Sequence, residues 1–273
     1  MKITLKIKDN GNQILAIAEK NLKLSLRFKA PLVLRFFLPI FTILMPLIIM
    51  GQLFSFREEF GPWNETNYFV FQFVASQLYI IFNMRNAFAG SLRTEKFWFT
   101  LQALIIAPFN RVNLLLGYFL TYLLLSSPGL IIFFVACYII YPISLLTVIA
   151  MLFIYLLSAF AFSGIGLILA IFAISKENIV PFLGFGLQLF FLFSTLNLPF
   201  EFFPSYIQNI IDLNPLYYIV NFTRLVWIED NFFYSVSSHF ISFMILIISS
   251  ISLPIIGLKV FNYIFDRYGI VGY

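Results

Sequence analysis

The sequence is poor in cysteine, histidine and charge. Among its 273 residues only Cys137 and His239 represent the first two types, which excludes an internal disulfide, a cysteine-based metal cluster and a histidine-pair zinc site. Charged residues account for 11% of the chain, whereas about a quarter is usual in soluble domains. A water-soluble protein of this size needs a more polar surface, so the composition excludes that class.

Groups that carry covalent chemistry are also scarce. No Gly-x-x-x-x-Gly-Lys-Ser/Thr phosphate loop occurs in the sequence, so we expect no nucleotide site of that type. The sequence has one histidine and few carboxylates, so no Ser-His-Asp/Glu catalytic triad can be proposed from it. We therefore expect no catalytic residue, no metal site and no cofactor on this chain, and we do not expect it to be an enzyme by itself.

Long apolar stretches dominate the sequence instead. Hydrophobic residues make up 61% of it, Phe occurs 37 times, and the mean hydropathy is +0.95. A helix needs about 20 apolar residues to cross the hydrocarbon core of a bilayer. These stretches predict an all-α polytopic membrane protein, a single transmembrane domain over residues 1–273, with six transmembrane helices at about 32–56, 67–84, 112–140, 145–174, 179–198 and 233–258. Tyr141-Pro142 separates the third and fourth, because proline interrupts a helix.

The basic residues predict the orientation. Six spans put both termini on one side, and a cytoplasmic N-terminus leaves only Arg57 and Arg224 of the 17 basic residues outside. Because cytoplasmic segments are enriched in Lys and Arg, this fifteen-to-two division predicts that both termini lie in the cytoplasm. We expect a multi-pass protein of the plasma membrane. The net charge of +5 is then explained by topology, and we expect no nucleic acid partner.

The segment 12–29 has the pattern of an amphipathic helix. Glu19, Lys20, Lys23 and Arg27 share one side at helical spacing, and leucines and an alanine form the opposite stripe. This pattern is typical of a helix that lies in the inner membrane interface and contacts lipid headgroups, although an ordinary juxtamembrane helix would share it. Residues 2–8 alternate basic and apolar types, which suits a short strand or a frayed tail.

Residues 199–230 are too apolar for a solvated loop and too rich in charge and proline for a span. A helical hairpin that dips into the outer leaflet satisfies both observations, provided that its broken backbone packs against protein. We interpret Glu201 and Asp212 as anchors at the interface or as ionic partners of Arg224, and we do not interpret them as catalytic groups.

The centres of the six predicted spans lack charged residues, which argues against ion-driven transport. The polar side chains of these spans are uncharged, and most of them lie in the second and fifth spans. Such residues usually bond neighbouring helices, but they are also our candidates for lining a pathway suited to amphipathic or apolar cargo. The candidates are Thr42, Gln72, Ser76, Gln77, Gln188, Ser194, Thr195 and Asn197.

Two segments resemble the permease subunits of ABC transporters of the type-2 export class. Between the second and third spans, the run from Arg93 to Leu104 followed by Ala107-Pro108 is similar to the cytoplasmic segment of that family, with Phe99 in place of a glycine and Gln102 in place of a glutamate. Before the sixth span, Asn214-Pro215-Leu216 resembles a family motif of the outer re-entrant region. The other members of the two matches are Glu95, Thr100, Leu101, Gly117, Leu198, Pro199, Pro204, Tyr217, Tyr218 and Arg224.

The resemblance implies a half-transporter. Two six-span subunits, identical or related, would form the pathway at their interface, and separate nucleotide-binding ABC ATPase subunits would bind ATP and Mg and hydrolyse the ATP. Segment 85–111 would be the cytoplasmic coupling loop, and segment 199–230 the outer re-entrant region. The implied coupling residues are Glu95, Phe97, Trp98, Thr100, Leu101, Gln102 and Pro108, and the implied outer motif is Glu201, Pro204, Asn214, Pro215 and Arg224.

Two other functions remain open from the sequence. A channel or an ion-coupled carrier would be expected to hold acidic or basic residues in the middle of its spans. An accessory membrane subunit that transports nothing would copurify with an ATPase whose turnover does not respond to substrate.

Overall fold

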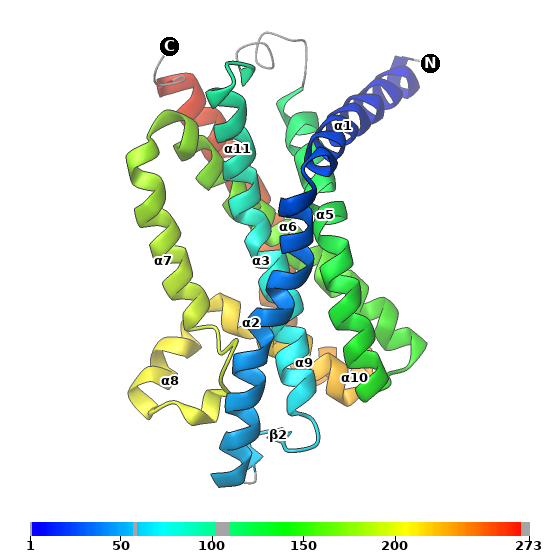
Figure 1. Ribbon diagram of the computed structural model, residues 1–273, viewed down its shortest axis with the longest axis vertical. Helices are drawn as coiled ribbons and strands as arrows, with labels where there is room; N and C mark the ends of the chain where they lie inside the picture. The colour runs from blue at the N-terminus through cyan, green and yellow to red at the C-terminus, as the bar shows by residue number, and fades with distance from the viewer. Residues whose placement is uncertain (1, 57–58, 102–109, 269–273) are drawn as a thin grey trace.

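The computed structural model describes residues 2–56, 59–101 and 110–268, which are predominantly helical (Figure 1). Its α-helices are α1 (Lys2–Arg27), α2 (Lys29–Phe56), α3 (Tyr68–Phe97), α5 (Arg111–Ile140), α6 (Leu145–Ser175), α7 (Val180–Leu192), α8 (Ser205–Asp212), α9 (Pro215–Glu229), α10 (Phe232–Ser238) and α11 (Phe240–Tyr268). Two 3-10 turns, Glu177–Ile179 and Phe200–Phe202, and one antiparallel pair, β1 (Glu59–Phe60) with β2 (Trp63–Asn64), complete the described structure.

Four helices in the described ranges are long and apolar enough to cross a membrane. These segments are Pro39–Phe56 of α2, Val112–Ile140 of α5, Leu145–Ser175 of α6 and Phe240–Arg267 of α11. The helix α3 is long but carries polar and charged residues, and the apolar helix α7 has only 13 residues. The predicted all-helical polytopic membrane protein is therefore confirmed at the level of fold class.

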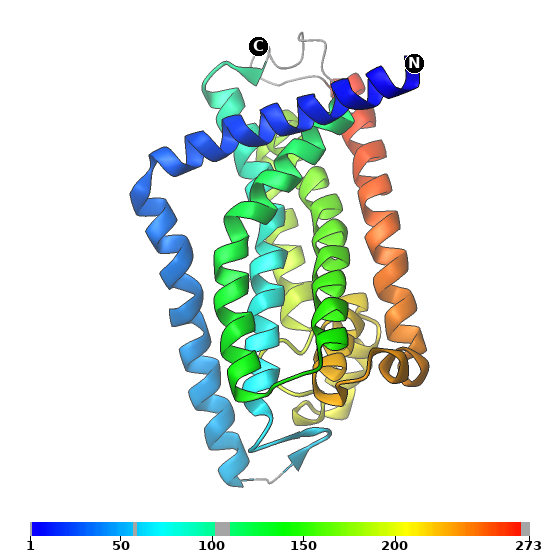
Figure 2. The same cartoon turned by 90° about the vertical axis from the view of Figure 1, so that its right-hand side faces the viewer.

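The long helices run side by side along the molecule, whereas α1 lies across one end of them (Figure 2). The N-terminal end of α1 and the C-terminal end of α11 lie at this same end. The helices α8, α9 and α10 and the β1–β2 pair gather at the opposite end. We call these the α1 end and the α9 end.

Local sequence explains where the helices begin. The side chains of Asn110, Ser144, Asn214 and Asn231 each accept a hydrogen bond from a backbone N–H in the first turn of the following helix. Such capping satisfies donors that have no partner inside the helix. The predicted break at Tyr141-Pro142 is confirmed, because α5 ends at Ile140 and α6 starts at Leu145.

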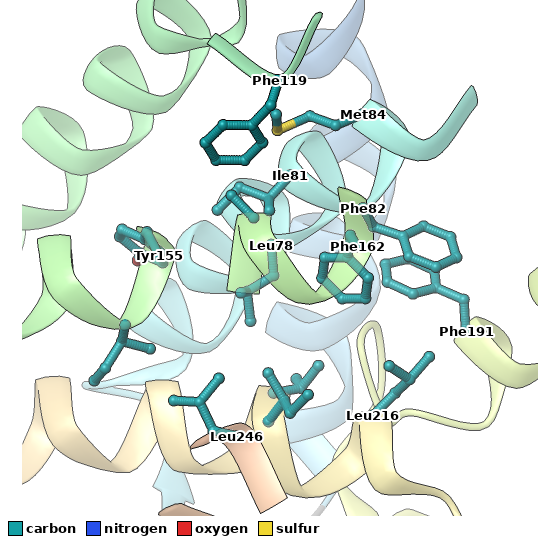
Figure 3. Packing of buried hydrophobic residues seen from close by; sticks show 14 of the residues in the cluster. Leu78, Ile81, Phe82, Met84, Phe119, Tyr155, Phe162, Phe191, Leu216 and Leu246 are labelled. Carbon is teal, nitrogen blue, oxygen red and sulfur yellow. The ribbon is translucent and has the colours of Figure 1, made fainter. Parts of the chain in front are cut away.

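The core lies where α3, α6 and α9 meet, and Figure 3 shows part of it. The Phe82 ring stacks on Phe191 from α7 at a centroid distance of 3.8 Å and meets the Phe162 ring of α6 edge to face. Cys137 is buried in this cluster, as expected for an inert thiol. Because α3 is buried on several sides, it is the central helix of the described core.

Several helix ends differ from the predicted limits of the spans and loops. Helix α3 does not end near Met84 but continues to Phe97, since the segment contains no proline, so much of the predicted coupling loop 85–111 is helical. The predicted strand or tail at residues 2–8 belongs to α1. The fifth predicted span, 179–198, ends as a helix at Leu192, and the sixth, 233–258, is divided into α10 and a longer α11.

Candidate functional site

The predicted coupling segment forms an aromatic turn at the α1 end. Helix α3 stops at Phe97, and Phe99 turns the chain with a φ of +59°. Phe97 and Phe99 are 77% and 72% exposed, and Trp98 is exposed as well. Leu101 is buried, so it anchors the turn to the protein. Large apolar side chains held outside the core in this way mark a surface that fits a partner or the headgroup region.

Glu95 fixes the position of this turn. Its buried carboxylate accepts a hydrogen bond from Lys20 Nζ of α1 at 2.5 Å and another from the Thr100 hydroxyl. The Thr100 backbone N–H also donates to the Glu95 carbonyl at 3.0 Å. One carboxylate therefore joins α1, α3 and the aromatic turn. The Glu95 carboxylate is thus engaged within the chain, and the exposed aromatic side chains are the groups that a partner could reach.

The remaining coupling residues of the sequence prediction, Gln102 and Pro108, lie outside the residues that the structure describes.

The α1 helix is also docked onto the start of α5. A Cβ atom on Gly117 would lie 2.7 Å from the Ile17 side chain, so only glycine allows this approach. Nearby, the Asn113 side-chain amide donates to Asn10 Oδ1 and Gln13 Oε1, both at 2.8 Å. The middle part of α1 is thus attached to the bundle.

One face of α3 is polar from end to end. Small or polar residues recur along it at steps of three and four, namely Gln72, Ser76, Tyr79, Asn83, Asn86, Gly90 and Thr94. This spacing places them on one side of a helix. Asn86, Gly90 and Thr94 are exposed, and Ser76, Tyr79 and Asn83 are partly so. We call this the α3 polar face, and the sequence prediction found only its first two members.

On a different side of α3 from the polar face, Arg85 is buried between α3, α6 and α7. Its Nη2 atom donates to Gln188 Oε1 at 3.1 Å, and its guanidinium carbon lies 3.5 Å from the Phe82 ring centroid. The Nε and Nη1 atoms have no hydrogen-bond partner in the described parts of the chain. Sequence reasoning had assigned Arg85 to an inner loop, because the uncharged stretch ends at Met84.

The depth of Arg85 follows from its neighbours. Its Cα would lie 3.0 Å from a Cβ atom on Gly166, nine residues before the end of α6 at Ser175. At 1.5 Å per residue, Arg85 is about 14 Å below that helix end. Charged residues that lie within a membrane span are usually functional, so Arg85 is a candidate functional residue if α3 spans the membrane at this level.

At the α9 end, Arg224 joins three segments. Its Nε donates to the Phe71 carbonyl at 3.2 Å, Nη1 to Thr195 at 2.8 Å, and Nη2 to Leu196 at 2.5 Å. The guanidinium carbon lies 3.4 Å from the Phe71 ring centroid. No carboxylate in the described structure pairs with Arg224, so the predicted ionic partnership with Glu201 or Asp212 is wrong.

The other members of the predicted outer motif support this end. The Asn214 amide donates to the Phe190 carbonyl at 2.6 Å, and its Oδ1 caps α9 just before Pro215. Pro204 precedes the first residue of α8. Glu201 Oε2 is buried without a described hydrogen-bond partner.

The predicted pathway residues fall into two groups. Gln72 and Asn197 meet, because the Gln72 amide donates to the Asn197 carbonyl at 3.0 Å, and the polar face places Ser76 one turn further along α3. Gln188 is exposed on α7 next to Arg85. Gln72 is buried, as are Gln77, Ser194 and Thr195. The Thr42 side chain lies outside the described residues.

Comparison with known proteins identifies the family of this chain. The ABC-2 type transporter family matches residues 12–227, which is most of the 273-residue chain. The chain belongs to this family. No curated protein matches the sequence. Family membership makes the chain a permease subunit of the ABC type, a class that generally carries no catalytic activity and pairs with ABC ATPases.

The structure of this ABC-2 permease contains a large cavity at the α1 end. The cavity has a volume of about 1000 Å³ and lies between the last turns of α1, the second half of α3 and the middle of α5. Asn83, Gly90 and Thr94 of the α3 polar face line it, together with Trp98. No sequence signal marked this space, because its walls come from three segments that are separated in the sequence, residues 21–28, 79–98 and 122–129.

Proposed function

We propose that the chain is the membrane-spanning half of an ATP-driven ABC exporter in the plasma membrane. Two copies, or one copy and a related chain, would form the pathway, and separate ATPase subunits would bind ATP and Mg. The helices α2, α3, α5, α6, α7 and α11 would be the six spans. Their alternating course in Figure 1, with both termini at the α1 end, supports this proposal.

The main support for the proposal is the aromatic turn, which is formed by Phe97, Trp98 and Phe99. Glu95, Lys20 and Thr100 hold the turn to α1 and α3, while Phe97, Trp98 and Phe99 remain exposed beyond the helix. A rigid turn transmits a push from a cytoplasmic motor into the central helix α3 better than a loose loop would. Exposed aromatic anchors often dominate the binding energy of interfaces.

The α3 polar face supports the transport role. An exposed polar face on a membrane helix is unfavourable against lipid, so it should face water, cargo or a second subunit. Gln188 and the exposed apolar side chains of α7, Phe182, Phe185 and Phe190, continue this open side. We place the dimer interface and the pathway there, between α3 and α7.

Reconstitution tests this proposal. The chain and its ATPase subunits are coexpressed, purified as a complex and placed in proteoliposomes. We expect no ATP binding by the isolated chain and substrate-stimulated hydrolysis by the complex. Stoichiometric ATP binding by the isolated chain would refute the proposal, and an ATPase whose turnover never responds to substrate would favour an accessory subunit.

Orientation is tested by cysteine labelling. The native Cys137 is buried, so we expect it to react little with a thiol reagent, and labelling will report the introduced cysteines. Asn64→Cys should react with an impermeant reagent added outside, and Lys176→Cys should react only after the membrane is opened. The reverse pattern would overturn the topology.

Arg85 favours one second candidate, an ion-coupled carrier. Two of its guanidinium nitrogens are buried without a hydrogen-bond partner in the described structure. Charged residues inside membrane spans usually serve transport. A carrier of this kind would move an anion along an ion gradient in proteoliposomes without any ATPase. Gradient-driven uptake that Arg85→Gln abolishes would establish it over the exporter.

A further inference from the structure

Lys96 joins the aromatic turn to the end of helix α6. Its carbonyl accepts a hydrogen bond from the Phe99 backbone N–H at 3.1 Å, and its Nζ atom donates to the Ile174 carbonyl of α6 at 3.2 Å. The preceding residue, Glu95, bonds to Lys20 of α1 instead. Successive side chains of a helix point about 100° apart, so these two reach different neighbours. The turn is therefore held to α1 and to α6 by two adjacent residues of opposite charge.

The Ile174 carbonyl needs a donor from outside its own helix. Helix α6 ends at Ser175, and the last four carbonyls of a helix have no donor within it. Ile174 is only 1% exposed, so the Lys96 ammonium supplies a hydrogen bond where water has little access. A cation at this position also interacts favourably with the negative end of the helix macrodipole. The contact thus satisfies a buried acceptor and stabilises the last turn of α6.

The rest of α6 is in close backbone contact with its neighbours. A Cβ atom on Gly166 would lie 3.0 Å from the Arg85 Cα of α3. One on Gly164 would lie 2.2 Å from the Leu253 carbonyl carbon of α11. The two glycines are about 12 and 15 Å along the helix from Ile174. A displacement of the Ile174 end of α6 must therefore be taken up by α11 as well.

We propose that Lys96 is a positioning residue that couples the aromatic turn to α6. This inference rests on the proposed function, in which the ATPase binds the turn. The two connections differ in direction, since Glu95 leads to α1 across the end of the bundle and Lys96 leads to α6, which runs along it (Figure 2). Displacement of the turn by the ATPase moves the end of α6 through Lys96, and α6 carries the movement to α11. Lys96 acts through the position of α6 and not through contact with the cargo.

Three substitutions separate the contact from the charge. Lys96→Met removes the ammonium and keeps an unbranched apolar chain. Lys96→Arg keeps a charged donor at the same position. Arg93→Met is the matched control, because it removes one positive charge from the same part of α3 but Arg93 is exposed.

Amide hydrogen exchange, followed by mass spectrometry of the purified full-length chain, measures the contact without any transport. Residues 170–179 report on the end of α6, and residues 10–27 report on α1. We expect Lys96→Met to speed exchange at the end of α6 at least threefold and to leave α1 unchanged, because the last turn of α6 loses a hydrogen bond. Lys96→Arg and Arg93→Met should exchange like the wild type.

The same measurement on the complex with the ATPase tests the coupling role. The complex is compared without nucleotide and with ATP and vanadate. We expect exchange at residues 170–179 of the wild type to differ at least threefold between these two states. Lys96→Met should lose most of this difference while it captures the ATPase with unchanged affinity, and Lys96→Arg should restore it. A lysine that only stabilised the fold would not affect the response to nucleotide.

Three results would overturn the proposal. The first is native exchange at the end of α6 in Lys96→Met, since the contact would then not hold α6. The second is a response to nucleotide that Lys96→Met retains, because the movement would then reach α6 through its packing on α3. The third is the same effect in Arg93→Met, which would assign it to the loss of positive charge.

Failure of the proposed function has a different signature. A wild-type chain that captures no ATPase would refute that function and, with it, the coupling role of Lys96. The exchange of the isolated variants would still show whether Lys96 holds the end of α6. Capture of the ATPase by the wild type and by Lys96→Met, with the response to nucleotide present in both, refutes the role of Lys96 alone.

Discussion

The Lys20 ammonium lies 2.5 Å from a Glu95 carboxylate oxygen, and this ion pair joins the helix that crosses the α1 end to the central helix α3. Glu95 is buried, whereas the Lys20 side chain is 46% exposed. The carboxylate also holds Thr100 at the start of the segment after α3. Movement of the aromatic turn must therefore move α1 or break this pair.

A double-mutant cycle on Lys20→Met and Glu95→Gln tests that connection. Because one partner is half exposed, we expect a coupling free energy of only about 1 kcal/mol. We expect a larger effect on function, with hydrolysis by the ATPase complex continuing while substrate transport falls. Lys23→Met is the control, since its exposed pair with Glu19 lies within one helix. Additive single mutants with native transport would contradict the connection.

The aromatic turn should bind the ATPase. Replacing Phe97 and Trp98 together by Ala leaves the Glu95 contacts in place and removes two exposed anchors. We expect normal insertion and thermal stability but at least tenfold weaker capture of the ATPase subunits in a pull-down titration. Phe56→Ala, an 87% exposed aromatic in α2 at the α9 end, should not change capture. Native capture by the double variant would show that the ATPase binds elsewhere.

The crossing of α6 and α11 depends on two glycines. A Cβ atom on Gly164 would lie 2.2 Å from the Leu253 carbonyl carbon, and one on Gly257 would lie 2.5 Å from the Gly164 oxygen. Both clashes are with backbone, which cannot move aside as a side chain can. We expect Gly164→Ala and Gly257→Ala each to lower stability by about 1–3 kcal/mol.

The matched control for the two glycines is Gly184→Ala in α7, where a Cβ atom meets nothing within 4 Å. Alanine there should raise stability by about 0.5–1 kcal/mol through helix propensity. Thermal denaturation in one detergent compares the three variants. A Gly257→Ala protein as stable as Gly184→Ala would show that the helices can separate at little free-energy cost.

Sequence patterns predicted the features that depend on local composition. Apolar length located the helical segments, and Pro142 located the break before α6. Basic and apolar sides at helical spacing predicted an amphipathic helix at 12–29, most of which lies in α1, whereas the alternation at 2–8 wrongly suggested a strand or tail. The drop in hydropathy after Met84 predicts a loop, but α3 continues to Phe97. The helix continues because Arg85–Phe97 contains no proline and Glu95 and Arg85 find partners inside the protein.

The partners of buried charges were not predictable in the same way. Lys20 and Glu95 are 75 residues apart, and many other basic residues in the predicted cytoplasmic segments were equally plausible partners. Arg224 donates hydrogen bonds to backbone carbonyls. Every residue has a backbone carbonyl, so the side-chain types in the sequence could not predict these partners. The cavity between α1, α3 and α5 likewise depends on how three helices pack.

Among the residues of the α9 end, substitution of Arg224 should lower the stability most. It donates to carbonyls on two segments, α3 and the turn after α7, and Thr195 there has a φ of +57°, which is unusual for a β-branched residue. The strained turn therefore depends on the guanidinium for its position. Arg224→Met leaves three carbonyls without this donor, and each such loss in a buried site is destabilising by about 1–3 kcal/mol.

Arg224→Lys separates the role of charge from that of geometry. An ammonium keeps the charge but is a compact donor that cannot span both segments or stack on Phe71 as the planar guanidinium does. We expect Arg224→Lys to be nearly as unstable as Arg224→Met in thermal denaturation, and Arg267→Met, an exposed arginine near the end of α11, to be close to the wild type. If lysine restores native stability, the charge alone holds this end together and the three carbonyl contacts are incidental.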